Sequence, residues 1–223
     1  MNMKTTLTLL ACAAVCASTA MIAPQAMGAR RGHAKVMTYN NSDFYTNGKF
    51  NEAKAKEAYF AMMKRFDYPC PKNLHDNMWV LDFHVGHFTD CGMGGIFWLN
   101  SQEGGYCGHE IFLLPGQMIP EHSHHATKKG PAKDEGWHVR YGSIHVIGEG
   151  TPSPGWEKVV PASQHAFISV KHMKELEPGE VASLNRKLAH HFMVAGPQGA
   201  IVSEYATFHD SDGVRFQNPN VHF

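Results

Sequence analysis

Gly116 to Gly142 reads GQMIPEHSHHATKKGPAKDEGWHVRYG and is the most informative segment of this 223-residue chain. Pro115 and Gly116 predict a turn that leads into a strand. His122 and His124 are two residues apart on that strand, so their side chains should point to the same face. Two imidazoles on one face can bind the same metal ion, and the segment therefore predicts a metal site.

A carboxylate and a distant histidine would complete this predicted site. Glu135 adds an oxygen ligand to the two imidazoles of His122 and His124. Mixed nitrogen and oxygen ligands suit Mn, Fe, Co, Ni or Zn better than Ca or Mg. A fourth ligand should come from a strand far along the chain, and His190 and His191 are the candidates. The alternative is a pair of exposed strand histidines beside a solvated glutamate.

The spacing of these residues resembles the first cupin motif. Gly116 is followed by five residues and the His-x-His pair, and Glu135 is followed by six residues and Gly142. The gap departs from the motif, because ten residues separate His124 from Glu135, where the motif has only a few. The resemblance implies an all-β fold, a cupin (jelly-roll) β-barrel, with an insertion near 126–132.

One helix is predicted before the strands, from Asn51 to Phe66. Asn51 can cap it, Glu52 lies in its first turn, and Pro69 and Pro71 end it. Apolar residues recur on one face of this helix: Ala55, Ala58, Tyr59, Met62 and Met63.

Segments that alternate with a period of two follow the helix and predict strands at 78–88, 94–100, 109–114, 143–148, 165–170, 190–196 and 200–208. Loops are expected at 126–136 and 149–156, which are rich in Gly, Pro and charged residues. Many short strands without intervening helices indicate a sandwich or small barrel.

The N-terminus is typical of a secretory signal peptide. Lys4 is followed by an apolar stretch and by small residues at Ala26 and Gly28, which predicts a periplasmic or secreted protein. A membrane anchor, or a lipoprotein modified at Cys12, is the alternative. The expected domains are a signal peptide at 1–28, an N-terminal arm with the helix at 29–77, and the barrel at 78–223.

Charge and cysteine content exclude several classes of protein. Lysine and arginine together number 20 and the acidic residues also number 20, and no basic stripe exists that would favour nucleic acid. Cys70, Cys91 and Cys107 follow the expected leader, and without a Cys-x-x-Cys pair they predict neither a thiolate zinc site nor thioredoxin chemistry. We expect buried free thiols, with one disulfide as the alternative.

Several blocks between 78 and 220 resemble the D-lyxose ketol-isomerase family of sugar isomerases. Lys133-Asp-Glu135 is similar to the family's Lys-x-Glu, in which the glutamate binds metal and the lysine faces the substrate. His190-His191-Phe192 resembles its His-x-Phe, which favours His190 as the fourth ligand. The segments 79–88 and 203–216 also resemble family blocks, and the second is the most specific because no generic cupin requires it.

This resemblance implies a metal-dependent aldose–ketose isomerase that acts on a free sugar, of the D-lyxose/D-xylulose or D-mannose/D-fructose type. The implied metal ligands are His122, His124, Glu135 and His190, with Mn²⁺ expected and Zn²⁺, Co²⁺ or Fe²⁺ as alternatives. Moving hydrogen between C1 and C2 builds negative charge on two oxygens, which a divalent ion stabilises.

The same chemistry requires groups that carry protons and groups that hold the sugar. Glu204 is the expected base, and Lys133 is the expected acid or electrophilic partner. Arg215, with Asp210 as its partner, is expected to bind the substrate, either by holding sugar hydroxyls or by orienting a carboxylate, and a structural clamp is the alternative. His209 and the other histidines are expected as surface or core residues, and the aromatic cluster around Phe97 as core, although one ring could stack on a sugar.

Departures from the family keep two other functions open. The segment 137–142 replaces a family block, and Ser203 stands where the family has glycine. A non-catalytic metal-dependent carbohydrate-binding cupin and a cupin dioxygenase are the rivals; Lys133 and Glu204 favour an isomerase over the dioxygenase. The expected partner is a small-molecule sugar, with no nucleic acid and no membrane span, and a homodimer is an open alternative.

Overall fold

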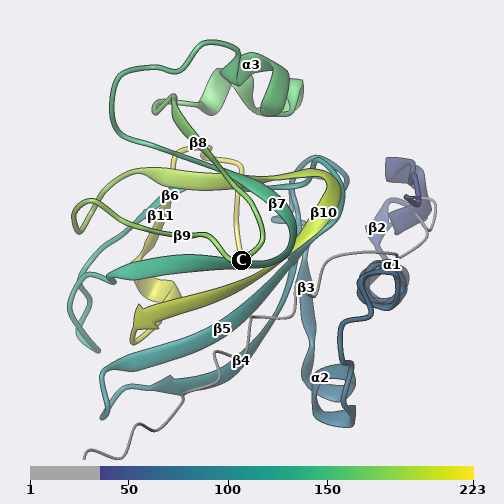
Figure 1. Cartoon of the computed structure of the whole chain (residues 1–223), viewed down its shortest axis with the longest axis horizontal. Helices are drawn as coiled ribbons and strands as arrows, with labels where there is room; N and C mark the ends of the chain where they lie inside the picture. The colour runs from purple at the N-terminus through teal and green to yellow at the C-terminus, as the bar shows by residue number, and fades with distance from the viewer. Residues whose placement is uncertain (1–35) are drawn as a thin grey trace, which may run out of the picture. The chain divides into compact units, whose positions relative to one another are not determined.

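Antiparallel strands curl around an interior in the computed structural model, which describes residues 36–223 (Figure 1). The expected signal peptide at 1–28 and the first residues of the expected arm lie outside the described residues. Within 36–223, no helix combines the length and apolar character that a membrane crossing needs. The domain boundaries proposed from the sequence remain predictions.

The N-terminal elements lie to one side of the strands (Figure 1). They are η1 (Asn41–Phe44), β1 (Tyr45–Thr46), β2 (Lys49–Phe50), α1 (Glu52–Phe66) and α2 (Lys72–Asn77). The side chain of Asn51 caps α1 by accepting a hydrogen bond from the backbone N–H of Lys54 at 3.2 Å. All five residues of the predicted apolar face are buried. The predicted helix and its cap are confirmed.

The strands that follow form one antiparallel nine-stranded sheet. Their bounds are β3 (Trp79–Leu81), β4 (Met93–Ser101), β5 (Tyr106–Leu113), β6 (Met118–His124), β7 (Glu135–Gly148), β8 (His172–Leu176), β9 (Val181–Ser183), β10 (His191–Thr207) and β11 (Val214–Phe216). Short helices interrupt them: α3 (Trp156–Val159), η2 (Ala162–Phe167) and η3 (Ser211–Gly213). The predicted all-β class is confirmed.

The long strands β7 and β10 give the sheet its curl, because each bends partway along its length and pairs with different strands before and after the bend. The first half of β10 pairs with β6 and the second half with β5, while β7 pairs with both halves. The register shifts between Ala195 and Ala200, where Gly142 and Gly199 both have positive φ. A Cβ on Gly142 would lie 1.8 Å from the carbonyl oxygen of Gly199, so this bend requires glycine at 142.

Four predicted strands differ from the structure. The strand predicted at 78–88 ends at Leu81, because Phe83 and His84 have positive φ and form a turn in which Asp82 accepts the His84 N–H at 3.0 Å. The segment 165–170 lies largely in η2 and its exit. The two strands predicted at 190–196 and 200–208 are one bent strand, β10.

Helix α1 is joined to the strand that carries the histidine pair. Tyr59 is buried and donates a hydrogen bond to the side chain of Gln117 at 2.5 Å, and Gln117 donates to the carbonyl of Phe88 at 2.5 Å. Gln117 directly precedes β6. A buried amide with both ends satisfied fixes the start of that strand, and therefore the direction in which its side chains point.

Cys70, Cys91 and Cys107 are free thiols; the last two are buried, whereas Cys70 is exposed.

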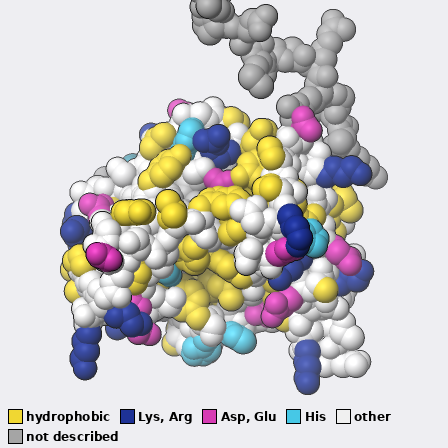
Figure 2. Space-filling view, turned by 90° about the horizontal axis from the view of Figure 1, so that it is seen from below, with side chains coloured by type: hydrophobic (Ala, Val, Ile, Leu, Met, Phe, Trp, Pro, Cys, Tyr) yellow, Lys and Arg dark blue, Asp and Glu magenta, His cyan; other side chains and the backbone are white. Residues whose placement is uncertain are grey.

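Figure 2 shows apolar side chains gathered around a hollow in the middle of one face, with charged side chains mostly around it.

Candidate metal centre and active-site cavity

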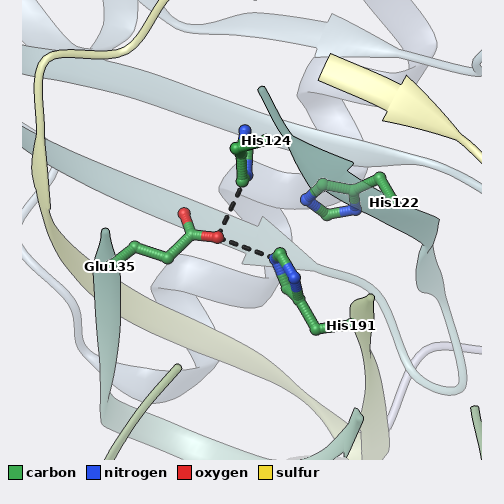
Figure 3. Close-up of side chains that lie close together, drawn as sticks. All are labelled: His122, His124, Glu135 and His191. Carbon is green, nitrogen blue, oxygen red and sulfur yellow. Dashed lines mark ion pairs between the residues drawn. The ribbon is translucent and has the colours of Figure 1, made fainter. Parts of the chain in front are cut away.

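Four side chains from three strands converge inside the curled sheet. His122 and His124 come from β6, Glu135 from the start of β7, and His191 from the start of β10. One ligand atom from each lies within 4.8 Å of all the others, and the side chains point toward one another (Figure 3). The Nε2 atoms of His124 and His191 lie 3.0 and 2.7 Å from the same oxygen, Oε1 of Glu135. This geometry places three nitrogen donors and a carboxylate around one point.

Backbone carbonyls orient two of these imidazoles. Nδ1 of His122 lies 2.8 Å from the carbonyl of Pro120, and Nδ1 of His191 lies 2.9 Å from the carbonyl of Ala189. A carbonyl can only accept, so Nδ1 carries a proton in both rings and Nε2 is the ring atom left to bind a metal ion. Hydrogen bonds of this kind are typical around metal-binding histidines, because they fix the ring and its tautomer.

The residues fit a divalent metal ion. Nε2 of His124, Nε2 of His191 and Oε1 of Glu135 are all buried, and they approach one another as ion pairs without an assigned hydrogen bond. A shared metal ion would satisfy all three atoms. Burial lowers the pKa of His122 well below its usual value and also lowers the pKa of His124. Burial raises the pKa of Glu135, but Lys133 and His124 lower it by more, so its pKa lies well below the usual value. Neutral imidazoles at His122 and His124 and an ionised carboxylate at Glu135 are the forms that bind a metal ion.

The structure places His191 in the cluster, and not His190, which we expected as the fourth ligand. His190 lies outside the cluster and is partly exposed, and its Nδ1 lies 2.9 Å from the buried carboxylate of Glu121. His191 takes the place that we expected for His190. The pairing of β10 with β6 shifts register between His191 and Met193, and this irregularity sets which of the two histidines faces inward.

Lys133 and Glu204 extend the cluster away from the metal ligands. Lys133 Nζ lies 2.6 Å from Oε2 of Glu135 and 2.5 Å from Oε1 of Glu204, and all three residues are buried. Burial raises the pKa of Glu204, but Lys133 lowers it by more, to about 2. The two carboxylates raise the pKa of Lys133 by more than burial lowers it. At neutral pH this group is therefore a lysine cation between two carboxylate anions.

A cavity of about 310 Å³ opens beside these residues. Its polar lining consists of the four clustered residues together with Lys133, Glu204, His109, His209 and Ser211. Aromatic side chains line much of the rest: Trp79, Phe83, Phe97, Trp137, Phe216 and Phe223. Small-molecule sites typically combine apolar walls with a few polar groups in this way. The aromatic residues that we expected as core are therefore also cavity wall.

Two expected substrate-binding residues do not line this cavity. Arg215 is exposed on β11 and donates hydrogen bonds to the carbonyls of Asp212 and Val214 at 2.7 and 2.8 Å. Asp210 accepts from Thr127 at 2.6 Å and pairs with Lys129 at 3.2 Å. The geometry of this cavity does not support the expectation that they hold the sugar, because the side chains alternate along β11, so that Val214 and Phe216 face the cavity and Arg215 faces away.

Reasoning from the sequence missed two cavity histidines, His109 and His209. Burial lowers the pKa of His209 to about 3, so this ring is neutral at physiological pH. His109 lies directly opposite Glu204 on the neighbouring strand. The alternation along β5 predicts that His109 shares a face with Ile111, and that signal could have found it.

Comparison with proteins of known sequence identifies sugar isomerases. The D-lyxose/D-mannose isomerase of Thermosediminibacter oceani is 30% identical over 166 residues, which cover 74% of this chain and 90% of that protein. The D-lyxose ketol-isomerase of Cohnella laeviribosi is 32% identical over 142 residues, which cover 64% of this chain and 76% of that protein. A D-lyxose ketol-isomerase of Thermofilum sp. is 28% identical, over 75% of this chain and 92% of that protein. No family model matches the chain.

Comparison with solved structures supports the fold. The L-ribose isomerase of Cellulomonas parahominis with L-ribose has a TM-score of 0.60 at 14% identity, covering 74% of this chain and 90% of that one. The L-ribose isomerase of Acinetobacter sp. DL28 with L-ribose has a TM-score of 0.59 at 15% identity, covering 75% and 91%. At this level of identity the likeness shows a shared fold, and it confirms the predicted cupin class.

Proposed function

The chain belongs to the D-lyxose ketol-isomerase family, and we propose on that premise that it is a metal-dependent isomerase of free D-lyxose or D-mannose, giving D-xylulose or D-fructose. Aldose–ketose isomerisation follows from the family. The metal dependence rests on one observation above all: the buried donor atoms of His124, Glu135 and His191 meet at one point beside His122 and have no hydrogen bond assigned to them. Mn²⁺ suits such a mixed donor set, and Zn²⁺, Co²⁺ and Fe²⁺ are alternatives.

The charges in the cavity support an unphosphorylated substrate. Lys133 is the one lysine or arginine side chain in its described lining. Two carboxylates already neutralise that lysine, since Glu135 and Glu204 both lie within 2.6 Å of it. Apart from the proposed metal ion, which the sugar oxygens would occupy, a phosphate ester would therefore find no free cation in this largely apolar cavity, and burying its dianion there is unfavourable. The volume of about 310 Å³ lies at the small end of ligand sites and suits a monosaccharide.

The buried residues have distinct tasks in this reaction. When bound by the three histidines and Glu135, a divalent ion would act as a Lewis acid toward the sugar's C1 and C2 oxygens. Glu204 is ionised and borders the cavity, so it is the group placed to take a proton from carbon. Lys133 donates a hydrogen bond to Glu204 and can stabilise the carboxylate charge before the transfer.

One experiment tests the proposal. Protein stripped with a chelator and reloaded with Mn²⁺, Zn²⁺ or Co²⁺ is incubated with a panel of aldoses and ketoses, and the products are separated by chromatography. We expect turnover of an unphosphorylated aldose in the reloaded protein, and loss of turnover after stripping. The variant Glu204→Gln keeps the volume and removes the basicity, so it should bind metal normally and lose roughly a hundred-fold or more in kcat.

The outcomes separate the rival functions. Sugar binding without turnover in the metal-loaded wild type would support a carbohydrate-binding cupin. Oxygen consumption with Fe²⁺ would support a dioxygenase. Undiminished activity in Glu204→Gln would remove Glu204 from the mechanism, whatever the substrate. Export of the protein is a separate proposal that rests on residues 1–28, and cell fractionation tests it.

A further inference from the structure

A row of side chains crosses the inner face of the sheet at the level of Glu204. Phe97 on β4 pairs with His109 on β5, His109 pairs with Glu204 on β10, and Glu204 pairs with Trp137 on β7. Directly opposite residues on neighbouring strands have their Cβ atoms close together and point the same way. All four residues line the cavity. The backbone register therefore sets His109 beside the carboxylate that we propose as the proton acceptor.

The two oxygens of this carboxylate face different neighbours. Oε1 of Glu204 lies 2.5 Å from Nζ of Lys133, and Oε2 lies 3.8 Å from Nδ1 of His109. A distance of 3.8 Å exceeds a hydrogen bond, so His109 and this oxygen make a close polar approach. Loss of His109 would remove the contact at Oε2 and leave the lysine contact at Oε1. A carboxylate with both oxygens turned toward the lysine would direct neither oxygen at a substrate.

His109 is held in place by packing. It is 6% exposed, and its ring lies 4.4 Å from that of Phe97 and 5.4 Å from that of Trp79, with planes only 18° and 23° from parallel. Space for the ring comes from Gly95, where a Cβ would lie 2.5 Å from Nε2 of His109. The structure gives Nε2 no hydrogen-bond partner. A buried imidazole packed this closely, with a polar atom unpaired, requires an explanation beyond filling space.

We propose that His109 is the positioning residue for Glu204: its Nδ1 holds one carboxylate oxygen away from Lys133 and keeps it directed at the substrate. This inference rests on the proposed function only in that Glu204 is taken as the proton acceptor. The orientation of Glu204 is a property of the protein itself, and it can be measured without turnover.

Three substitutions at one position separate the two ring nitrogens. In His109→Asn the amide nitrogen lies close to the place of Nδ1, whereas in His109→Gln it lies closer to the place of Nε2. His109→Leu removes both nitrogens. We expect His109→Leu and His109→Gln to lose about ten- to a hundred-fold in kcat, because small displacements of a reacting group have effects of this size. Their KM should change by less than about threefold, and their metal content should match the wild type.

The conservative variant is the matched control. His109→Asn should recover kcat to within about fivefold of the wild type, because it restores a donor at Nδ1. If the role of His109 were purely structural, the kcat values of the three variants would follow their melting temperatures instead. Equal kcat values for His109→Asn and His109→Gln, or an unchanged kcat in His109→Leu, would overturn the proposal.

Crystal structures of metal-loaded His109→Leu and His109→Asn provide the second measurement. We expect both oxygens of Glu204 to turn toward Lys133 in His109→Leu, and one to stay with the amide in His109→Asn. If the carboxylate is oriented in His109→Leu as in the wild type, the inference is wrong even for an active isomerase. If it turns as expected but the wild type isomerises no sugar, the proposed function is wrong and the positioning role stands. Should His109→Leu not fold, Gly95→Ala displaces the same ring and should lower kcat similarly; no effect of that variant would also count against the proposal.

Discussion

Substituting His191 and His190 separately measures how far the proposed metal ion stabilises the protein. His191→Asn keeps an amide nitrogen near the place of Nδ1, so the hydrogen bond to Ala189 can survive, but it has no atom at the place of Nε2. It therefore removes one of four donors with little other change. Altering the hydrogen-bonded support of a ligand typically costs 10–100-fold in metal affinity, and loss of the ligand itself should cost at least about 100-fold.

The magnitude for stability follows from linkage. A ligand that binds the folded state stabilises it in proportion to the logarithm of its concentration over Kd, so a 100-fold weaker site loses about 2.7 kcal/mol of metal-dependent stability. For a protein of this size, 1 kcal/mol shifts Tm by roughly 2–4 °C. We therefore expect the metal-dependent part of Tm to fall by about 5–10 °C in His191→Asn.

Calorimetry with saturating Mn²⁺ and with chelator measures this difference directly. The chelated proteins give the cost of lost packing alone, since His191 also lies 5.3 Å from the ring of Trp137. His190→Asn is the control and should keep both its metal content and its metal-dependent Tm shift. A His190→Asn protein that loses its metal, beside a His191→Asn protein that keeps it, would refute the assignment of His191.

Three further predictions concern the fold around the site. Lys129→Ala removes exposed ion pairs between the insertion and residues 208–213, two of which line the cavity. We expect the free energy of unfolding to change little and KM for the sugar to rise without a change in kcat; an unchanged KM would contradict this. Gly142→Ala should lower the free energy of unfolding, measured by urea titration, far more than Gly116→Ala. Both glycines have positive φ, but only a Cβ at position 142 would collide with backbone atoms. Equal effects would refute the requirement for glycine at this bend. Of the three described cysteines only Cys70 should react quickly with a thiol reagent at pH 8, and rapid reaction of a second would contradict the burial of the others.

The sequence pattern predicts a helix or strand well where one face of that element is buried and the other is exposed to solvent. Helix α1 alternates buried and exposed positions with the helical period, and Asn51 stands where a cap is needed, so its bounds could be predicted. His122 and His124 share a face because residues two apart on a strand always do. The glycine at 142 could also be identified, although only the structure shows that its missing Cβ makes room for Gly199.

The sequence by itself determined that two histidines, a glutamate and a later histidine belong to a cupin-type site; only the tertiary structure decided which later histidine this is. The first residues of β10, His191 to Val194, are buried on both faces, so no alternation of polar and apolar residues marks the inner side. An irregularity in pairing after His191 then sets the register, and a shift of one residue turns every side chain to the opposite face. The pairing of His109 with Glu204 was decided in the same way, because it joins strands some 90 positions apart, and no local pattern encodes that contact.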